Sequence, residues 1–140
     1  MDSAVLITYD QDDIVDALPE QFHTPDNVQL MLYNAALWNG HRIHFDEPYA
    51  KEVEGYPGLV IAGPLLGDWL NQVVELWLGE SGRLTKIEYS NRVASYIGET
   101  LTAGGNVTAV EGNTITIEVY IKNEDGDVIA PGVATAEIIA

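Results

Sequence analysis

The 140-residue sequence contains no cysteine. This excludes catalysis by a thiol, zinc sites built on cysteine, and stabilisation by disulfides. A chain of this length buries roughly two thirds of its unfolded surface as one domain, so it folds without such cross-links. We therefore predict one globular domain over residues 1–140, in keeping with a reducing compartment.

Basic residues are also scarce. Six Lys and Arg residues face 22 Asp and Glu residues, which gives a formal net charge of −16. Such a chain repels nucleic acids and anionic lipids, so we expect neither as a partner. Two interpretations of the acidity stay open: a solvated surface that favours solubility, and adaptation to high salt.

The sequence lacks a long hydrophobic run. Its longest apolar stretch, residues 58–67, is interrupted by Pro64 and falls short of the ~20 residues that cross a bilayer. The first residues carry neither the positive charges nor the cleavage site of a signal peptide. We expect no membrane segment and a cytoplasmic location.

The first half of the chain is predicted to be helical after an N-terminal extension. Residues 1–21 form that extension, in which residues 4–9 are a candidate edge strand. Thr24-Pro25-Asp26 predicts a helix start with Thr24 as the N-cap, and the apolar spacing extends this helix to about Trp38. A short helix is expected over residues 47–53. From Pro64 to Leu78 the chain is apolar on nearly every side, which predicts a buried helix.

The second half reads as consecutive strands. β-branched residues with approximate period-two alternation mark residues 84–89, 101–110, 114–121 and 128–139. Asp125-Gly126 is a hairpin signal between the last two. Helices followed by strands favour an α+β fold in which one antiparallel sheet wraps around a long central helix.

The segment Trp38–Asp46 concentrates groups that can move protons. His41 and His44 lie between Asn39 and Asp46, and histidine exchanges protons near neutral pH. A hydrogen-bonded junction between helix and loop, with His41 exposed, is the alternative. A metal site on His41, His44 and Asp46 lacks further ligands, so no metal is expected. His23 is interpreted as an ordinary surface residue.

A second candidate lies at Ala62-Gly63-Pro64, where the buried helix begins. The first-turn amides of a helix have no internal partners, and the helix dipole makes this end electropositive. A thioester carbonyl placed there would be polarised. An ordinary glycine-proline helix start explains the same residues.

HRIHFDEPYAKEVEGYPGLVIAGPLL, residues 41–66, resembles the hydratase motif and central-helix start of MaoC-like acyl-thioester dehydratases and hydratases. The branch that it resembles contains mesaconyl-CoA hydratases and type 2 hydroxyacyl-thioester dehydratases. The likeness extends to the helix before the motif and to the strand-rich C-terminal part. It implies a single MaoC-like hotdog domain whose active site forms where two hotdog units meet, so a homodimer or a hotdog partner subunit is expected.

The resemblance also implies residue roles. His44 corresponds to the catalytic histidine, and Gly63 to the residue whose amide polarises the carbonyl. Asn39 stands where many relatives have an aspartate. Because asparagine cannot accept a proton as a base, Asn39 is expected to orient water or substrate, together with His41. His41 stands where asparagine is frequent, and Ala62 where we expect histidine before the glycine-proline pair.

Further residues complete the expected site. Asp46 is predicted to hold an imidazole in one tautomer, and Arg42 and Lys51 to contact phosphates of the carrier. Pro64, Ala62 and Tyr56 join the predicted substrate-binding set. The expected substrate is an enoyl or 3-hydroxyacyl thioester of coenzyme A or an acyl carrier, with no other cofactor.

Three other functions stay open. The hotdog fold also hosts thioesterases, and Asp68 or Glu75 on the central helix would then be the active carboxylate. Asn39 and Ala62 depart from the pattern of active relatives, which motivates a non-catalytic subunit that binds acyl thioesters. A diverged cyclase or isomerase is the third.

Overall fold

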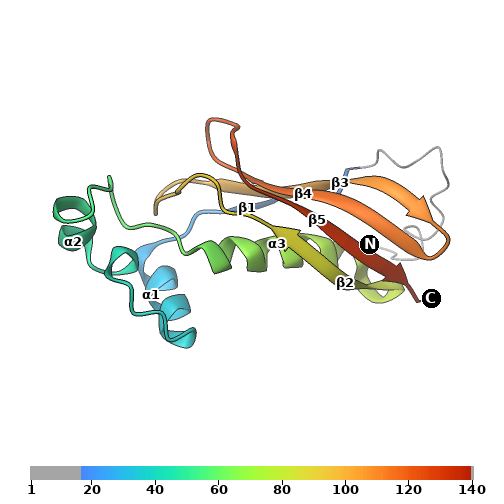
Figure 1. Ribbon diagram of the computed structural model, residues 1–140, viewed down its shortest axis with the longest axis horizontal. Helices are drawn as coiled ribbons and strands as arrows, with labels where there is room; N and C mark the ends of the chain where they lie inside the picture. The colour runs from blue at the N-terminus through green and yellow to red at the C-terminus, as the bar shows by residue number, and fades with distance from the viewer. Residues whose placement is uncertain (1–16, 140) are drawn as a thin grey trace.

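A computed structural model describes residues 17–139 (Figure 1). The candidate strand at residues 4–9 lies outside the described residues. A curved sheet arches over the long helix α3, while the short helices α1 and α2 lie at one end of the molecule. The helices are α1 (Asn27–Ala36), η3 (Arg42–His44), α2 (Glu47–Glu52), α3 (Gly63–Leu78) and η4 (Gly79–Ser81). The strands are β1 (Gln21–His23), β2 (Gly82–Tyr89), β3 (Leu101–Glu111), β4 (Thr114–Lys122) and β5 (Val128–Ile138).

The strands form one antiparallel sheet in the order β1-β3-β4-β5-β2. Two tight turns join β3 to β4 and β4 to β5, and each contains a glycine in the left-handed region: Gly112 at φ 60° and Gly126 at φ 84°. Strand β4 alternates as predicted, because Ile115, Ile117, Val119 and Ile121 are all buried on the face toward α3. The predicted strands and the α+β class are therefore confirmed.

Helix α3 supplies the centre of the hydrophobic core. Nine of its sixteen residues are buried, including Trp69, Leu70 and Trp77. An exposed stripe remains on the side away from the sheet, where Asp68, Gln72 and Leu76 lie, and Leu76 is 69% exposed. The predicted central helix is confirmed, but it is not buried on every side in a single chain.

The start of α1 differs from the prediction. Asp26, not Thr24, is the N-cap, because its Oδ1 accepts the Gln29 N–H at 2.8 Å. Thr24 instead hydrogen-bonds the Thr100 hydroxyl across 2.8 Å. The helix also ends two residues early, at Ala36, and Trp38 adopts a positive φ of 57°.

The N-terminal edge of the sheet places His23 against the core. Residues Gln21–His23 pair with Leu101–Ala103, and the His23 ring stacks on Trp69 with centroids 4.2 Å apart and planes 5° from parallel. Burial lowers the pKa of His23, since a low dielectric disfavours the charged imidazole. The interpretation of His23 as ordinary surface was wrong, because β1 folds back over α3.

Candidate active site

A cavity of about 420 Å³ opens where α3 begins. Its polar lining includes His44, Asn91 and Ser95, and the rest of its wall comes from the helix start and two neighbouring segments. The full lining is His44, Val60, Ile61, Gly63, Pro64, Leu66, Asn91, Arg92, Val93, Ala94 and Ser95. Three residues singled out from the sequence, His44, Gly63 and Pro64, therefore share one cavity.

Backbone hydrogen bonds fix the walls of this cavity. The extended segment before α3 lies between two others: Val60 N–H donates to Ile43 O at 3.0 Å, and Ile61 N–H donates to Ser95 O at 2.8 Å. On the same side, Ile97 N–H donates to Leu59 O at 3.2 Å. The loop that carries His44 and the start of α3 are thus tied to one short ladder.

His44 is buried, with 7% of its surface exposed, and its ring orientation is fixed. Its Nδ1 lies 2.7 Å from the carbonyl oxygen of Val60. Because a carbonyl can only accept, Nδ1 carries the proton and donates it. In the neutral ring Nε2 is then the unprotonated nitrogen, so His44 can act as a general base through that atom.

Gly63 provides an electropositive backbone end. It is the first residue of α3, and the N-cap Ala62 has no side chain that could cap the helix. The N–H of Gly63 has no acceptor within the helix, and the helix dipole adds partial positive charge there. Such an amide can stabilise an oxygen that gains negative charge.

Two residues of this cavity had no signal in the sequence. The carboxamide of Asn91 lies against Gly63: a Cβ placed on Gly63 would clash with Asn91 Nδ2 and lie 3.0 Å from Asn91 Cγ. Ser95 is 2% exposed, and its hydroxyl has no hydrogen-bond partner among the described residues. Both lie close to α3 only through tertiary folding, roughly thirty residues after it begins.

Asn39 and His41 do not line the cavity in the single chain. Asn39 Oδ1 accepts the His41 N–H at 3.1 Å, and His41 Nδ1 accepts the Ile43 N–H at 3.4 Å. His41 is exposed, while its ring packs edge-on against His44 with centroids 5.8 Å apart. These two residues shape the loop that presents His44, and their predicted contact with water or substrate stays a prediction.

Asp46 does not orient either imidazole, which corrects the predicted role. Its Oδ1 caps α2 by accepting the Tyr49 N–H at 3.2 Å, and its Oδ2 accepts from Arg42 Nε at 3.0 Å and Nη2 at 2.8 Å. The Arg42 guanidinium, followed by the Tyr49 N–H, holds the pKa of Asp46 below its usual value. The backbone carbonyl of Val60 performs the task predicted for this carboxylate.

The two basic residues predicted to bind phosphate already have anionic partners. Arg42 pairs with Asp46 and lies 4.2 Å above the Tyr49 ring, and Lys51 Nζ lies 2.7 Å from Glu47 Oε1. Tyr56 packs beside Tyr96, with centroids 6.3 Å apart, and does not line the cavity. Within residues 17–139, no three His, Asp or Glu side chains gather to hold a metal ion.

The family profile for hydroxyacyl-thioester dehydratase type 2 matches residues 10–97. The chain belongs to this family. Among curated proteins, the mesaconyl-C(4)-CoA hydratase of Chloroflexus aurantiacus is 55% identical over 42 residues, which are 30% of this chain and 15% of that protein. The matches to curated relatives span only 14% to 31% of those proteins' lengths.

Solved structures share the fold of this family member. The (R)-hydratase from A. caviae involved in PHA biosynthesis superimposes with a TM-score of 0.83 at 16% identity, over 90% of this chain and 96% of that one. A chain of the ChsH1–ChsH2 complex from Mycobacterium tuberculosis gives 0.81 at 21% identity, over 90% and 98%. The predicted hotdog fold is confirmed. In the described part of this chain, no helix has the length and apolar character needed to cross a membrane.

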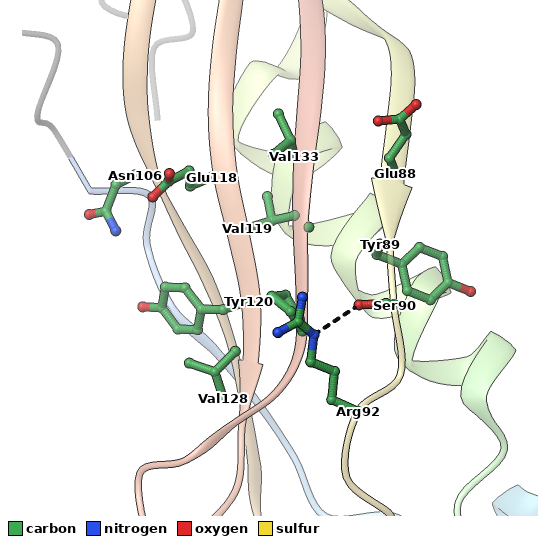
Figure 2. Close-up of a pocket in the computed structure, with 12 residues that line it drawn as sticks. Glu88, Tyr89, Ser90, Arg92, Asn106, Glu118, Val119, Tyr120, Val128 and Val133 are labelled. Carbon is green, nitrogen blue, oxygen red and sulfur yellow. Dashed lines mark hydrogen bonds between the residues drawn. The ribbon is translucent and has the colours of Figure 1, made fainter.

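A second cavity lies on the outer face of the sheet (Figure 2). It has a volume of about 560 Å³, and Arg92 borders both cavities. Arg92 Nε donates to Ser90 Oγ at 3.3 Å, and its guanidinium extends over the outer face toward Tyr120. Among the described residues, Arg92 has no carboxylate partner, whereas Arg42, Lys51, Arg83 and Lys86 each have one. Arg92 was not among the basic residues predicted from the sequence to lie at the site.

Proposed function

We propose that this chain catalyses the reversible hydration of an α,β-unsaturated acyl thioester, equivalent to dehydration of the 3-hydroxyacyl thioester. One observation carries the proposal: His44, with Nε2 as its unprotonated nitrogen, shares a cavity with the Gly63 amide. A base and a carbonyl-polarising amide are the two functions that this reaction needs. Membership of the hydroxyacyl-thioester dehydratase type 2 family supports the same reaction.

In the hydration direction, His44 Nε2 removes a proton from water as the water oxygen bonds to Cβ of the enoyl group. The carbon–carbon π electrons move toward the carbonyl, whose oxygen gains negative charge beside Gly63 N–H. The proton that His44 Nε2 took from water then passes to Cα, which completes the 3-hydroxyacyl product and regenerates the neutral imidazole, and dehydration reverses these steps. In this scheme Asn39 orients the water and does not accept its proton.

We further propose that the thioester is that of coenzyme A. The chain carries a net charge of −16, which opposes docking of an acidic carrier protein. The similarity to a mesaconyl-C(4)-CoA hydratase also supports a coenzyme A thioester as the substrate. No cofactor beyond the thioester is invoked, and the cytoplasmic location stays a prediction.

A second hotdog unit is proposed to complete the site, from a homodimer or a partner subunit. In residues 17–139, the edge strand β2 pairs only with β5, so its other edge is open to a further strand. Helix α1 exposes Val28, Met31 and Leu32, each at least 59% exposed, which a partner would cover. The structural neighbour ChsH1–ChsH2 is itself a complex of two proteins.

The thioesterase alternative is weaker because the cavity has no carboxylate. Asp68 is exposed on α3 and accepts a hydrogen bond from the Tyr33 hydroxyl at 2.7 Å. Neither Asp68 nor Glu75 lines the cavity that contains His44 and Gly63. Attack on the thioester carbonyl would therefore lack the carboxylate base predicted on the central helix.

A spectrophotometric assay with crotonyl-CoA and mesaconyl-CoA tests the proposal, by following loss of the conjugated thioester absorbance at low and high salt. We expect His44→Ala to lower kcat by about 10²- to 10⁴-fold, as loss of a general base does. His41→Ala removes the neighbouring ring and so separates the contributions of the two imidazoles to the rate. Asn39→Ala measures how much the Asn39 carboxamide contributes to the rate. Release of free thiol in place of hydration would favour a thioesterase. A folded, dimeric wild type that turns over no enoyl thioester would overturn the proposal.

A further inference from the structure

The side chain of Asn91 occupies the space beside the first residue of α3. A Cβ placed on Gly63 would meet three atoms of the Asn91 carboxamide and no other heavy atom more closely: Nδ2 in a clash, Cγ at 3.0 Å and Oδ1 at 3.6 Å. The amide nitrogen is therefore the end of Asn91 nearest to Gly63. Because only a residue without a Cβ leaves this room, Gly63 and Asn91 are sterically matched.

The strand that follows α3 places Asn91 there by its alternation. After β2, the chain continues along β5: Ser90 N–H donates to Pro131 O at 3.1 Å, and Arg92 N–H donates to Ile129 O at 2.9 Å. Tyr89 and Asn91 then point to the α3 side, while Arg92 extends over the outer face of the sheet (Figure 2).

This alternation matches the spacing of glycines on α3. Tyr89 contacts Gly67 and Asn91 contacts Gly63, so two residues along the strand correspond to four along the helix. Two strand residues span about 6.6 Å and four helix residues about 6.0 Å, which keeps both contacts in register. The position of Asn91 is thus set by the packing of β2 on α3.

The donors of the Asn91 carboxamide are not used in hydrogen bonds within the protein. Within residues 17–139 the Asn91 side chain forms no hydrogen bond with the protein, and the residue is exposed in the single chain. Its NH₂ group can donate two hydrogen bonds, and the Gly63 N–H beside it has no acceptor in the helix. No carboxylate lines the cavity to compete for these donors.

A second polar group of this cavity, the buried hydroxyl of Ser95, also indicates that a ligand binds here. Ser95 lines the cavity, the residue is 2% exposed, and its hydroxyl has no partner among the described residues. Buried hydroxyls in proteins are nearly always hydrogen-bonded, so an unpaired one in a cavity wall indicates a missing polar partner. The cavity thus combines His44, two adjacent donors and an unsatisfied hydroxyl.

We infer that Asn91 is a second hydrogen-bond donor to the thioester carbonyl oxygen, acting beside the Gly63 N–H. The inference rests on the proposed hydratase function and adds a residue to it. Two donors on one oxygen stabilise the negative charge that develops as water adds to Cβ. Since that charge is largest in the transition state, Asn91 affects kcat more than KM.

Three variants test this role kinetically. Asn91→Ala is expected to lower kcat for crotonyl-CoA by about 10²- to 10³-fold with little change in KM, as loss of an oxyanion donor does. Asn91→Asp keeps the size but replaces donors with a negative charge, so its loss should exceed that of Asn91→Ala. Asn113→Ala, an exposed asparagine in the β3–β4 turn, should retain wild-type rates. A wild-type rate in Asn91→Ala, or an Asp variant more active than the Ala variant, would overturn the inference and leave the hydratase proposal intact.

A measurement without turnover separates the two proposals. Butyryl-CoA labelled with ¹³C at the carbonyl has no double bond to hydrate, and hydrogen bonds to its oxygen lower the C=O stretching frequency. We expect the C=O stretching frequency of butyryl-CoA bound to wild type to be lower than that of free butyryl-CoA. In Asn91→Ala the frequency of the bound ligand should lie between these two values. A band that is the same in wild type and Asn91→Ala, or no binding of butyryl-CoA to wild type, would contradict the role of Asn91 whether or not the protein is a hydratase.

Discussion

Tyr89 fills the space that a side chain on Gly67 would need. A Cβ placed on Gly67 would clash with the phenol oxygen and Cζ of Tyr89 and lie 2.8 Å from its Cε1. Gly67 lies in the second turn of α3 and is buried, and Tyr89 ends β2. A glycine in a helix interior costs about 1 kcal/mol relative to alanine, so the helix is less stable at this position in exchange for the close approach of the strand.

A double-mutant cycle measures this relationship. In Tyr89→Ala the space is free, and Gly67→Ala should raise the free energy of unfolding by about 1 kcal/mol through helix propensity. In wild type the added methyl must displace the Tyr89 ring, so the same change should be less favourable by at least about 1 kcal/mol. Chemical denaturation of the four proteins gives the coupling energy.

Gly132→Ala is the matched control, because the atom nearest to its added methyl group belongs to the backbone and cannot move aside as a side chain can. A Cβ there would lie 2.6 Å from the backbone oxygen of Glu88, so the change should destabilise by about 1–3 kcal/mol both in wild type and in the Tyr89→Ala variant. Additive effects of Gly67→Ala and Tyr89→Ala would show that the two residues do not share this space.

Most of the fold could be predicted because its signals are local. The alternation of β4 and the apolar length of α3 depend only on neighbouring residues, and the structure places both as expected. The prediction that Thr24 caps α1 was wrong, because Thr24 and Asp26 are both residue types that cap helices and they lie only two residues apart. Tertiary contacts decided between them, since the Thr24 hydroxyl bonds Thr100 and leaves Asp26 to cap the helix.

Some residues of the candidate site could likewise be predicted from local sequence, whereas others could not. His44 and Gly63 could be predicted from one contiguous motif, and they share a cavity. Asn91 and Ser95 lie in a different segment and come close only when β2 packs on α3. Nor could the sequence show that Val60 O, and not Asp46, holds the His44 ring, because a backbone carbonyl leaves no residue-specific signal.

His23 should make stability depend on pH. Burial against Trp69 lowers its pKa below 6.5, and its Nε2 is buried without a partner among the described residues. As pH falls through 6.5 the unfolded chain therefore binds a proton that the folded chain does not, so stability falls until the pKa of the folded state is passed.

His23→Phe keeps a ring on Trp69 and removes the titrating group. The difference in free energy of unfolding between this variant and wild type should grow in favour of the variant as pH drops from 7 to 5. Urea denaturation of both proteins at several pH values provides the measurement. A constant difference across this range would show that His23 does not titrate differently on folding.

The Ser95 hydroxyl should contribute nothing to the stability of the free protein. Its oxygen is buried and unpaired within the described residues, and an unsatisfied buried polar group costs about 1–3 kcal/mol. Ser95→Ala should therefore leave the free energy of unfolding unchanged or raise it by about 1 kcal/mol. Chemical denaturation of wild type and Ser95→Ala measures the difference. A loss of stability in Ser95→Ala would reveal a hydrogen bond to the Ser95 hydroxyl.

Salt should stabilise this protein. Folding brings the charges that make up the net charge of −16 closer together and so increases their repulsion. The four ion pairs found within residues 17–139 lie at the surface, where solvent weakens their attraction. Raising ionic strength from 0.1 to 1 M shortens the screening length from about 10 Å to about 3 Å. Contacts within an ion pair survive this better than repulsion across the surface, so we expect the Tm to rise by at least about 4 °C.

A charge variant shows whether that rise comes from repulsion. Glu52, Glu80 and Glu111 are exposed and belong to none of the four ion pairs, and replacing all three by Gln changes the net charge from −16 to −13. This triple variant should melt higher than wild type in 0.1 M KCl and gain less from added salt, because less repulsion remains to be screened. Calorimetry across a KCl series tests both. Equal salt dependence in the two proteins would mean that potassium chloride acts through hydration of the surface and not through its charge.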